Sequence, residues 1–158
     1  MSKSFWRLVL SVSLAGLAAA PLAAADDPDV PYWASLTADK VNMRAGPARD
    51  YAISWVYRRD NLPVKVVRLH EGWRLVEDPD GTRGWILSRF LSRARWGIVQ
   101  GKISELREKP DGTGKLMWRV EPGVVGRLGD CQNGWCRFDV HGHKAYIAAD
   151  AVWGDGEP

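Results

Sequence analysis

The sequence predicts an all-β protein made of two small tandem β-barrels of five to six short strands each. Three observations predict this fold class. Aromatic residues recur at a nearly constant spacing, short apolar runs alternate with turn compositions, and the chain after residue 25 has no ten-residue amphipathic helical stretch. A chain of 158 residues is long enough for one ordinary domain or for two very small ones.

Residues 1–25 have the features of a cleaved secretory signal peptide. Lys3 and Arg7 form a short positive region, residues 8–20 are apolar, and small residues precede a cleavage point after Ala25. The apolar run is too short to span a bilayer comfortably. We therefore expect an exported protein, periplasmic or secreted, that does not span the membrane after signal cleavage.

The charge of the chain after residue 25 is nearly balanced. The signal segment holds two of the 22 basic residues and none of the 19 acidic ones, which leaves 20 basic against 19 acidic residues. This balance argues against a nucleic-acid partner. Basic residues cluster locally at 58–59 and across 89–95. A solvated strand end or linker is the simpler interpretation of these clusters, and an anionic-ligand site is the alternative.

The aromatic residues reveal an internal repeat. Six pairs of residues recur 61 to 63 positions apart: Trp33/Trp96, Arg44/Arg107, Pro47/Pro110, Trp55/Trp118, Trp73/Trp135 and Trp85/Tyr146. We interpret the chain as two copies of one unit, a first repeat at 33–92 and a second repeat at 96–153. Because only residues 93–95 separate them, we expect the two units to pack on each other.

Within the first repeat, short runs of β-branched and apolar residues follow one another in order. These runs are "KVNMR", "LPVKVVRL", "GWRLVED" and "TRGWIL", and the segments between them, "AGPARDY", "HEG" and "DPDG", have turn compositions. The second repeat has the same order of runs and turns. Five or six short strands in about 60 residues favour a small barrel or sandwich that protects its strand edges.

Cys131 and Cys136 bracket the sequence "QNGW" in the second repeat. Asn-Gly is a strong signal for a two-residue type I′ hairpin, which places the two cysteines opposite each other on adjacent strands. An exported protein meets an oxidising compartment, so we predict a cross-strand disulfide. A redox-active pair is the alternative, but the spacing is not C-x-x-C and no helix is predicted to lower a thiol pKa.

Catalytic and metal-binding motifs are not evident in the sequence. His141 and His143 lie two residues apart near Asp139, but the repeat places them at a hairpin tip, and zinc needs three or four such ligands. No nucleophile elbow, catalytic triad or phosphate loop is present. We therefore expect no catalytic residues, no metal, no cofactor and no enzyme, with a site at the seam between the repeats as the remaining enzymatic option.

Aromatic residues that occur in both repeats are explained first by the shared fold. Those that occur in one repeat only are better candidates for recognition. Tyr51, Tyr57 and Phe90 belong to this second group, since the corresponding residues of the second repeat are Gly114, Val120 and Ala151. An exposed tyrosine offers a large contact area at low entropic cost. Packing of each ring against a neighbouring loop is the equally supported alternative.

Two segments of the first repeat carry a family resemblance. "VNMRAGPARDY" resembles the N-x-R-x-G-P opening of the bacterial SH3-like (SH3b) domain, and "LHEGWRLVEDPDGTRGWILSRFL" resembles its G-W and G-W-[IV] ending. The resemblance covers residues 33–92. The second repeat resembles the family in outline only, with "SELREKP" for "VNMRAGP", Lys109 for Gly46 and Tyr146 for Trp85.

The resemblance implies two tandem SH3-like barrels, the second degenerate, that serve as a non-catalytic binding module. Its expected ligand is peptidoglycan or an extended peptide of a cell-envelope partner, and we expect a monomer. The alternative is a structural or regulatory adaptor that docks on another exported protein, which an apolar surface patch on the second repeat would favour. The candidate ligand-binding residues are Asn42, Tyr51, Tyr57, Trp73, Trp85 and Phe90.

Other residues of the shared motif have expected structural roles. The second repeat keeps the arginine and the proline but not the asparagine or the glycine, so Arg44, Pro47, Arg107 and Pro110 are interpreted as parts of the fold. We expect Arg44 to tie the first strand to a neighbouring loop by hydrogen bonds. Asn42 and Gly46 distinguish the first repeat, where Gly46 is expected to shape the loop that leads to Tyr51.

Overall fold

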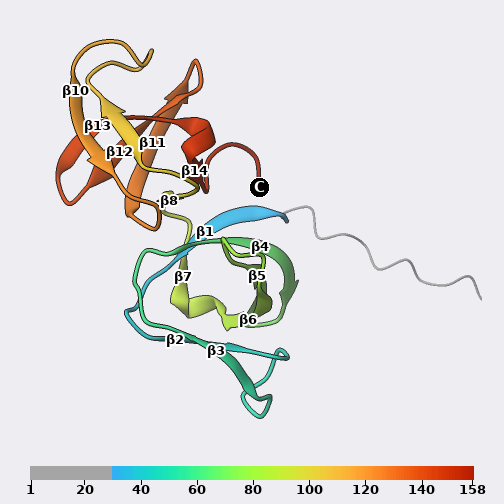
Figure 1. The fold of residues 1–158 in the computed structure, drawn as a ribbon. Coiled ribbons are helices and arrows are strands. Elements are labelled where there is room, and N and C mark those ends of the chain that lie inside the picture. The colour runs from blue at the N-terminus through green and yellow to red at the C-terminus, as the bar shows by residue number, and fades with distance from the viewer. Residues whose placement is uncertain (1–29) are drawn as a thin grey trace, which may run out of the picture.

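The computed structural model describes residues 30–158. The predicted signal peptide lies outside the described residues. Within residues 30–158, no helix has the length and apolar character needed to cross a lipid bilayer. Figure 1 shows two β-rich bodies, one built from the blue and green part of the chain and one from the yellow and red part.

The first body is one antiparallel sheet of seven strands. The strands lie in the order β3-β2-β6-β5-β4-β1-β7, and a short 3-10 turn, η1, precedes the last strand. The elements are β1 (Tyr32–Leu36), β2 (Val41–Arg44), β3 (Ile53–Tyr57), β4 (Pro63–His70), β5 (Trp73–Glu77), β6 (Arg83–Leu87), η1 (Ser88–Phe90) and β7 (Leu91–Ser92).

The second body repeats this arrangement. Its strands lie in the order β10-β9-β13-β12-β11-β8-β14, and η2 again precedes the last strand. The elements are β8 (Trp96–Val99), β9 (Ser104–Arg107), β10 (Leu116–Val120), β11 (Val125–Gln132), β12 (Trp135–Val140), β13 (His143–Ala148), η2 (Ala149–Ala151) and β14 (Val152–Trp153).

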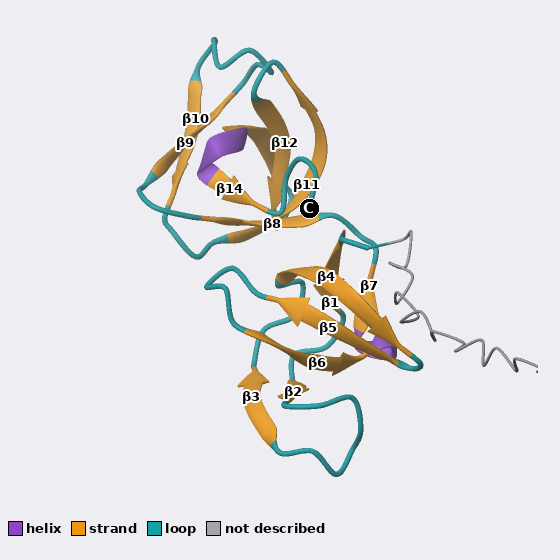
Figure 2. Cartoon of the chain, turned by 90° about the vertical axis from the view of Figure 1, so that its right-hand side faces the viewer, coloured by secondary structure: helices purple, strands orange, loops and turns teal. Residues whose placement is uncertain are grey.

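The predicted all-β fold class is therefore confirmed, and the two sheets have the same strand order. Each sheet has seven strands instead of five or six, because β7 and β14 are two-residue strands that follow the 3-10 turns and pair with β1 and β8. Figure 2 shows each sheet curling around its own interior, with β3 and β10 at the opposite edge of the strand order from β7 and β14.

Each sheet encloses a separate hydrophobic core, which the period-two pattern of the sequence produces. In β2, Val41 and Met43 are buried while Asn42 and Arg44 are only partly covered. The two cores distribute side-chain volume differently at one pair of contacting positions. Val64 and Val76 of the first core correspond to Gly126 and Phe138 of the second. A β-carbon at Gly126 would collide with the Phe138 ring, so the small residue accommodates the large one.

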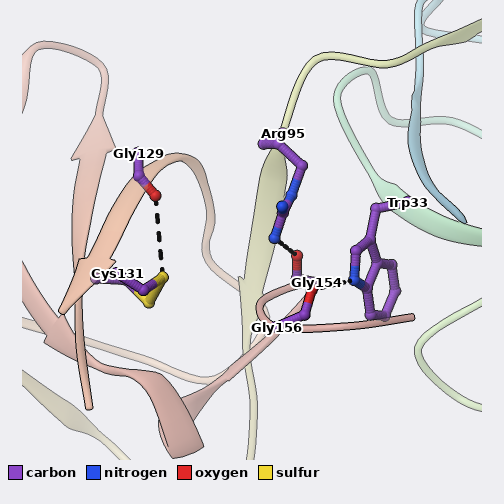
Figure 3. The surroundings of a disulfide bond; sticks show 7 residues. Trp33, Arg95, Gly129, Cys131, Gly154 and Gly156 are labelled. Atoms are coloured by element: carbon purple, nitrogen blue, oxygen red, sulfur yellow. Dashed lines mark hydrogen bonds between the residues drawn. A yellow bond between two sulfur atoms is a disulfide. The ribbon is translucent and has the colours of Figure 1, made fainter. Parts of the chain in front are cut away.

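The predicted disulfide is present at the hairpin between β11 and β12. Gln132 pairs with Trp135 and Cys131 with Cys136 in the antiparallel register, and the cysteine α-carbons are 3.9 Å apart. The turn residues Asn133 and Gly134 both have positive φ, as a type I′ turn requires. Figure 3 shows the disulfide at this hairpin. In the first repeat the same register pairs Leu69 with Arg74, so the hairpin also forms without the bond.

The two sheets contact each other directly. The Trp33 ring of β1 meets the Trp153 ring of β14 edge-on, with ring centroids 4.7 Å apart. The Trp33 indole N–H donates to the Gly156 carbonyl at 3.1 Å, and Arg95 Nη2 donates to the Gly154 carbonyl at 2.9 Å (Figure 3). The segment after β14 thus lies against β1 and the linker, and the expected packing of the two units on each other is observed.

Candidate ligand-binding site

Three of the six candidate ligand-binding residues come together in one pocket of the first repeat. Asn42 from β2, Trp73 from β5 and Phe90 from η1 border a pocket of 230 Å³. Its remaining lining residues are Lys40, Arg44, Arg49, Leu87 and Arg89. The pocket therefore collects residues from the first strand of the motif, the loop that follows it, and the 3-10 turn.

Local structure explains why these side chains converge. Because side chains alternate along a strand, burial of Val41 and Met43 places Asn42 and Arg44 on the other face of β2. Trp73 begins β5 after the turn at Glu71 and pairs with Leu87 across the β5–β6 ladder, so both reach the same face. The 3-10 turn then brings Arg89 and Phe90 to the rim of the pocket.

The pocket is strongly cationic. Four of its eight lining residues are Lys40, Arg44, Arg49 and Arg89, and none is acidic. Among residues 30–158, none of these four cations forms an ion pair. The Arg89 guanidinium lies over the Phe90 ring at 4.8 Å from its centroid. Charge and an aromatic surface are therefore combined at this site.

Arg44 also has the structural contact that the sequence analysis expects. Its Nη1 donates to the Tyr51 carbonyl at 2.6 Å, which ties β2 to the loop before β3. Arg107 makes the equivalent contact in the second repeat, where its Nη1 donates to the Gly114 carbonyl at 3.4 Å. Arg44 thus holds the loop with one nitrogen and borders the pocket as well.

The second repeat does not reproduce the cationic pocket. The residues that correspond to Lys40, Asn42, Arg49, Arg89 and Phe90 are Ile103, Glu105, Gly112, Asp150 and Ala151. Glu105 forms ion pairs with Arg107 and with Arg119, the latter at 3.7 Å. The arginine that the two repeats share is therefore neutralised in the second repeat by a carboxylate of its own strand.

The loop after β2 also distributes side-chain volume differently in the two repeats. The Tyr51 ring lies against Gly46, where a β-carbon would collide with it. In the second repeat Lys109 and Gly114 take these positions, so the larger residue stands on the other side of the loop. Tyr51 packs on its own loop and remains 49% exposed. Pro47 and Pro110 follow β2 and β9 at equivalent places.

Two further candidates lie outside the cationic pocket. Tyr57 is buried, and its hydroxyl donates to Asp78 Oδ2 at 2.8 Å. Burial, reinforced by the hydrogen bond and the charge of Asp78, raises the pKa of Tyr57 far above its ordinary range. Tyr57 therefore follows the packing alternative. Trp85 pairs with Arg44 across β2 and β6 and meets the His70 ring edge-on at 6.1 Å.

The expectation that paired aromatics serve the fold does not hold for Trp55 and Trp118. These residues lie on β3 and β10, the edge strands, and are 57% and 36% exposed. Four consecutive residues of β3 and of β10 are exposed, so along this stretch both faces of each strand lie outside the core. The second repeat exposes a patch of three consecutive apolar residues on β10, Leu116, Met117 and Trp118.

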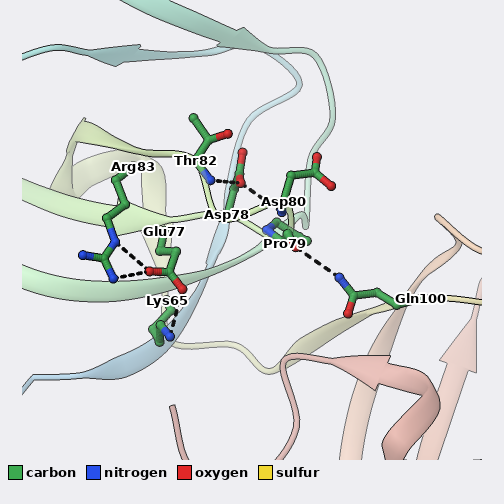
Figure 4. Close-up of polar contacts among 8 residues, drawn as sticks. All are labelled: Lys65, Glu77, Asp78, Pro79, Asp80, Thr82, Arg83 and Gln100. Carbon is green, nitrogen blue, oxygen red and sulfur yellow. Dashed lines mark hydrogen bonds and ion pairs between the residues drawn. The ribbon is translucent and has the colours of Figure 1, made fainter.

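A larger cleft of 790 Å³ lies where the two repeats meet. Its lining includes Trp55 and Tyr57 from the first repeat and Ile98, Gln100 and Pro122 from the second, with the β5–β6 loop between them. Gln100 Nε2 donates to the Pro79 carbonyl of that loop at 3.2 Å (Figure 4). This contact holds the loop against the second repeat.

Polar contacts order the β5–β6 loop and the strands beside it. Asp78 Oδ1 accepts hydrogen bonds from the backbone N–H groups of Asp80 and Thr82 at 3.0 and 2.8 Å. Glu77 forms ion pairs with Lys65 at 2.9 Å and Arg83 at 2.5 Å (Figure 4). These two cations, Lys65 first, lower the pKa of Glu77 below its ordinary value. The acidic residues here serve the fold.

Residues 30–158 contain no group of three or more His, Cys, Asp and Glu side chains that could hold a metal ion. His141 has a positive φ in the β12–β13 turn, and His143 begins β13 and meets the Trp118 ring edge-on at 5.2 Å. The two histidines thus lie at a hairpin tip, where the repeat places them. The disulfide accounts for both cysteines.

Sequence reasoning named none of the four pocket cations as a ligand-binding residue, since Arg44 is interpreted there as part of the fold. Arg89 begins the basic cluster for which an anionic-ligand site was the alternative interpretation. Lys40 and Arg49 stand as single charges in turns, where cations are common on any surface. A comparison of the repeats offered one signal, because three of the four cations are replaced by Ile103, Gly112 and Asp150.

The geometry agrees with comparisons to known proteins. The family model of the bacterial SH3 domain matches the chain twice, at residues 37–93 and 100–154. The chain therefore belongs to the bacterial SH3 domain family and contains two tandem copies of the domain, as the resemblance predicted. Bacterial SH3 domains are generally binding modules.

Two solved structures similar to the chain are those of NlpC2 and NlpC1 from Trichomonas vaginalis. NlpC2 is 16% identical with a TM-score of 0.37, and the alignment covers 80% of this chain and 49% of that one. NlpC1 is 18% identical with a TM-score of 0.35, covering 89% of this chain and 54% of that one. The chain thus spans about half the length of each. No curated protein matches the chain.

Proposed function

We propose that the protein is an exported, non-catalytic binding module whose first repeat recognises the peptide part of peptidoglycan. The single observation that carries this proposal is the pocket of the first repeat, where Asn42, Trp73 and Phe90 lie among unpaired cations. Membership of a family of binding modules supports it. The signal-like segment at 1–25 and the Cys131–Cys136 disulfide support export to an oxidising compartment.

A pull-down on purified sacculi tests this proposal. We expect the purified protein to be retained and the Phe90→Ala variant to be retained much less. Alanine stands at the equivalent position, Ala151, of the second repeat, but Phe90 packs against the first core, so circular dichroism first checks that the variant is folded. Trp118→Ala, which removes an exposed aromatic from the other repeat, is the matched control and should bind as the unsubstituted protein does. Equal retention of both variants, or none of the unsubstituted protein, contradicts the proposal.

The second candidate function is that of an adaptor that docks on another exported protein through its second repeat. The observation that favours it is the exposed patch of Leu116, Met117 and Trp118 on β10. Because β10 is the edge strand of its sheet, its free backbone groups can pair with an extended segment of a partner.

A charged substitution in this patch separates the two candidates. The variant Met117→Lys weakens an apolar docking face without touching the cationic pocket. If the adaptor role is correct, this variant loses a defined partner complex in the envelope while its retention on purified sacculi is unchanged. If Met117→Lys leaves every envelope complex intact, the adaptor role is contradicted.

A further inference from the structure

We propose that the cationic pocket of the first repeat is a carboxylate-binding site, in which Arg44, Arg49, Arg89 and Lys40 recognise an acidic group of an extended peptide. The source of this carboxylate, the peptide of peptidoglycan, rests on the proposed function. The affinity of the pocket for a carboxylate does not rest on that function, because it follows from the residues that line the pocket.

The charge balance of the pocket favours an anionic ligand. Four cations border a volume of 230 Å³, and no acidic side chain lines it. Like charges held together in one pocket repel each other, and a bound anion relieves that repulsion. Within the described chain this relief is not supplied internally, because the four ion pairs present there join other residues.

The second repeat holds an internal copy of the proposed contact. In β9 the Glu105 carboxylate binds the Arg107 guanidinium, with Arg119 on its other oxygen. Arg44 is the counterpart of Arg107, and Asn42 is the counterpart of Glu105. An arginine at this position of the fold is therefore placed to bind a carboxylate, and in the first repeat the neutral Asn42 leaves it free to bind one from outside.

The shape and composition of the rest of the pocket also fit an acidic residue of a peptide. Trp73, Leu87 and Phe90 line the same pocket and provide an apolar surface for the aliphatic part of an acidic residue. A volume of 230 Å³ fits one amino-acid side chain or chain end and is small for a chain of sugars. Arginine guanidinium groups also match carboxylates geometrically through paired N–H donors.

A glutamate in place of Asn42, as at Glu105 of the second repeat, tests the site directly. The variant Asn42→Glu gives the first repeat the residue that the second repeat already holds, so the fold tolerates it. We expect at least a tenfold loss of affinity for purified sacculi. Glu105→Asn, which makes the reverse change in the second repeat, is the control and should bind within about twofold of the unsubstituted protein. Equal affinity of Asn42→Glu overturns the proposal.

A second measurement keeps the test independent of peptidoglycan. Glutarate, a small dicarboxylate, is titrated while the indole N–H signal of Trp73 is followed by NMR. We expect a saturable shift that Asn42→Glu abolishes, and no shift with glutaramide, its uncharged analogue. Absence of a glutarate shift overturns the carboxylate site whatever the sacculi do. A glutarate shift together with no retention on sacculi supports the site and contradicts its assignment to peptidoglycan.

Sacculi whose peptide carboxylates have been converted to amides complete the design. If native sacculi retain the protein and amidated ones do not, the group on the sacculi that the protein binds is the carboxylate. If both are retained equally, the carboxylate proposal is overturned while the proposed peptidoglycan function stands.

Discussion

At the scale of single residues, Tyr57 and Asp78 join the end of β3 to the β5–β6 loop. Both side chains are buried, at 6% exposure each, and they are linked by the 2.8 Å hydrogen bond from the tyrosine hydroxyl. The same carboxylate accepts two backbone hydrogen bonds from its own loop. The loop that borders the cleft between the repeats is therefore fixed from the core of the first repeat.

We predict that Tyr57→Phe lowers the free energy of unfolding by about 2 kcal/mol, the usual value of a hydrogen bond to a charged group. The loss arises because the buried Asp78 oxygen is left without a partner. Urea unfolding measures the difference, with Tyr51→Phe as the control because Tyr51 is half exposed. A change no larger than that of the control contradicts the assigned role.

Glu77 provides a prediction of pH dependence. Its pKa is lowered in the folded protein by Lys65 and then Arg83, so its carboxylate contributes stability above the unfolded pKa of about 4.3 and loses that contribution as the pH falls through the lowered folded value. We predict that Glu77→Gln lowers the stability at pH 7 by about 0.5–1 kcal/mol, and that the difference disappears in acid. Unfolding measured from pH 7 to pH 3 checks this, and a constant difference contradicts it.

At the scale of elements, the sequence predicted the positions of the strands and turns better than it predicted which strand side chains are exposed. Period-two runs such as "KVNMR" and "LPVKVVRL" became β2 and β4, and Asn133-Gly134 formed the expected hairpin with the disulfide beside it. These signals are local, because the period-two pattern of a strand and the Asn-Gly pair of a hairpin are each contained in a few adjacent residues. The exposure of Trp55 could not be predicted, because it depends on which strand ends at the edge of the sheet.

The loop after β2 gives the prediction for this scale. We predict that Gly46→Lys alone destabilises the protein by about 1–3 kcal/mol, because the new side chain displaces the Tyr51 ring. The double variant Gly46→Lys/Tyr51→Gly gives the first repeat the arrangement that Lys109 and Gly114 have in the second. It should recover at least about 1 kcal/mol of that loss. Urea unfolding of the two single variants, the double variant and the unsubstituted protein measures the coupling. Additive effects of the two substitutions contradict it.

At the scale of the whole molecule, the two repeats contact each other through a small set of residues. Trp33 carries much of this interface, since it packs on Trp153 and donates to the Gly156 carbonyl. Gln100 adds a hydrogen bond to the Pro79 carbonyl of the first repeat, and Arg95 of the linker donates to the Gly154 carbonyl of the segment after β14. The short linker and these contacts together position the first repeat beside the second.

We predict that the two repeats unfold in one cooperative transition and that Trp33→Ala separates it into two. The substitution removes both the aromatic contact and the hydrogen bond that couple the repeats. Scanning calorimetry distinguishes the outcomes. Trp55→Ala, which removes an exposed tryptophan of an edge strand, serves as the control and should leave a single transition. One transition in Trp33→Ala contradicts the coupling.

The candidate site also belongs to the scale of the whole fold. Asn42, Trp73 and Phe90 were identified from the sequence one by one, yet only the sheet order and the 3-10 turn bring them into one pocket. The charges that surround them come from separate turns, and no linear motif joins Lys40, Arg49 and Arg89. Tyr57 became a candidate because it occurs in one repeat only. The sequence does not show that its side chain is buried, as it is in the structure.

The most direct test of the account is the affinity of the protein for purified sacculi when the pocket of the first repeat receives the residues of the second. The triple variant Asn42→Glu/Arg49→Gly/Arg89→Asp keeps the fold that the second repeat already shows for these residues. We predict that this variant loses retention, while Glu105→Asn in the second repeat binds as the unsubstituted protein does. Full retention of the triple variant would contradict the assignment of binding to the first repeat.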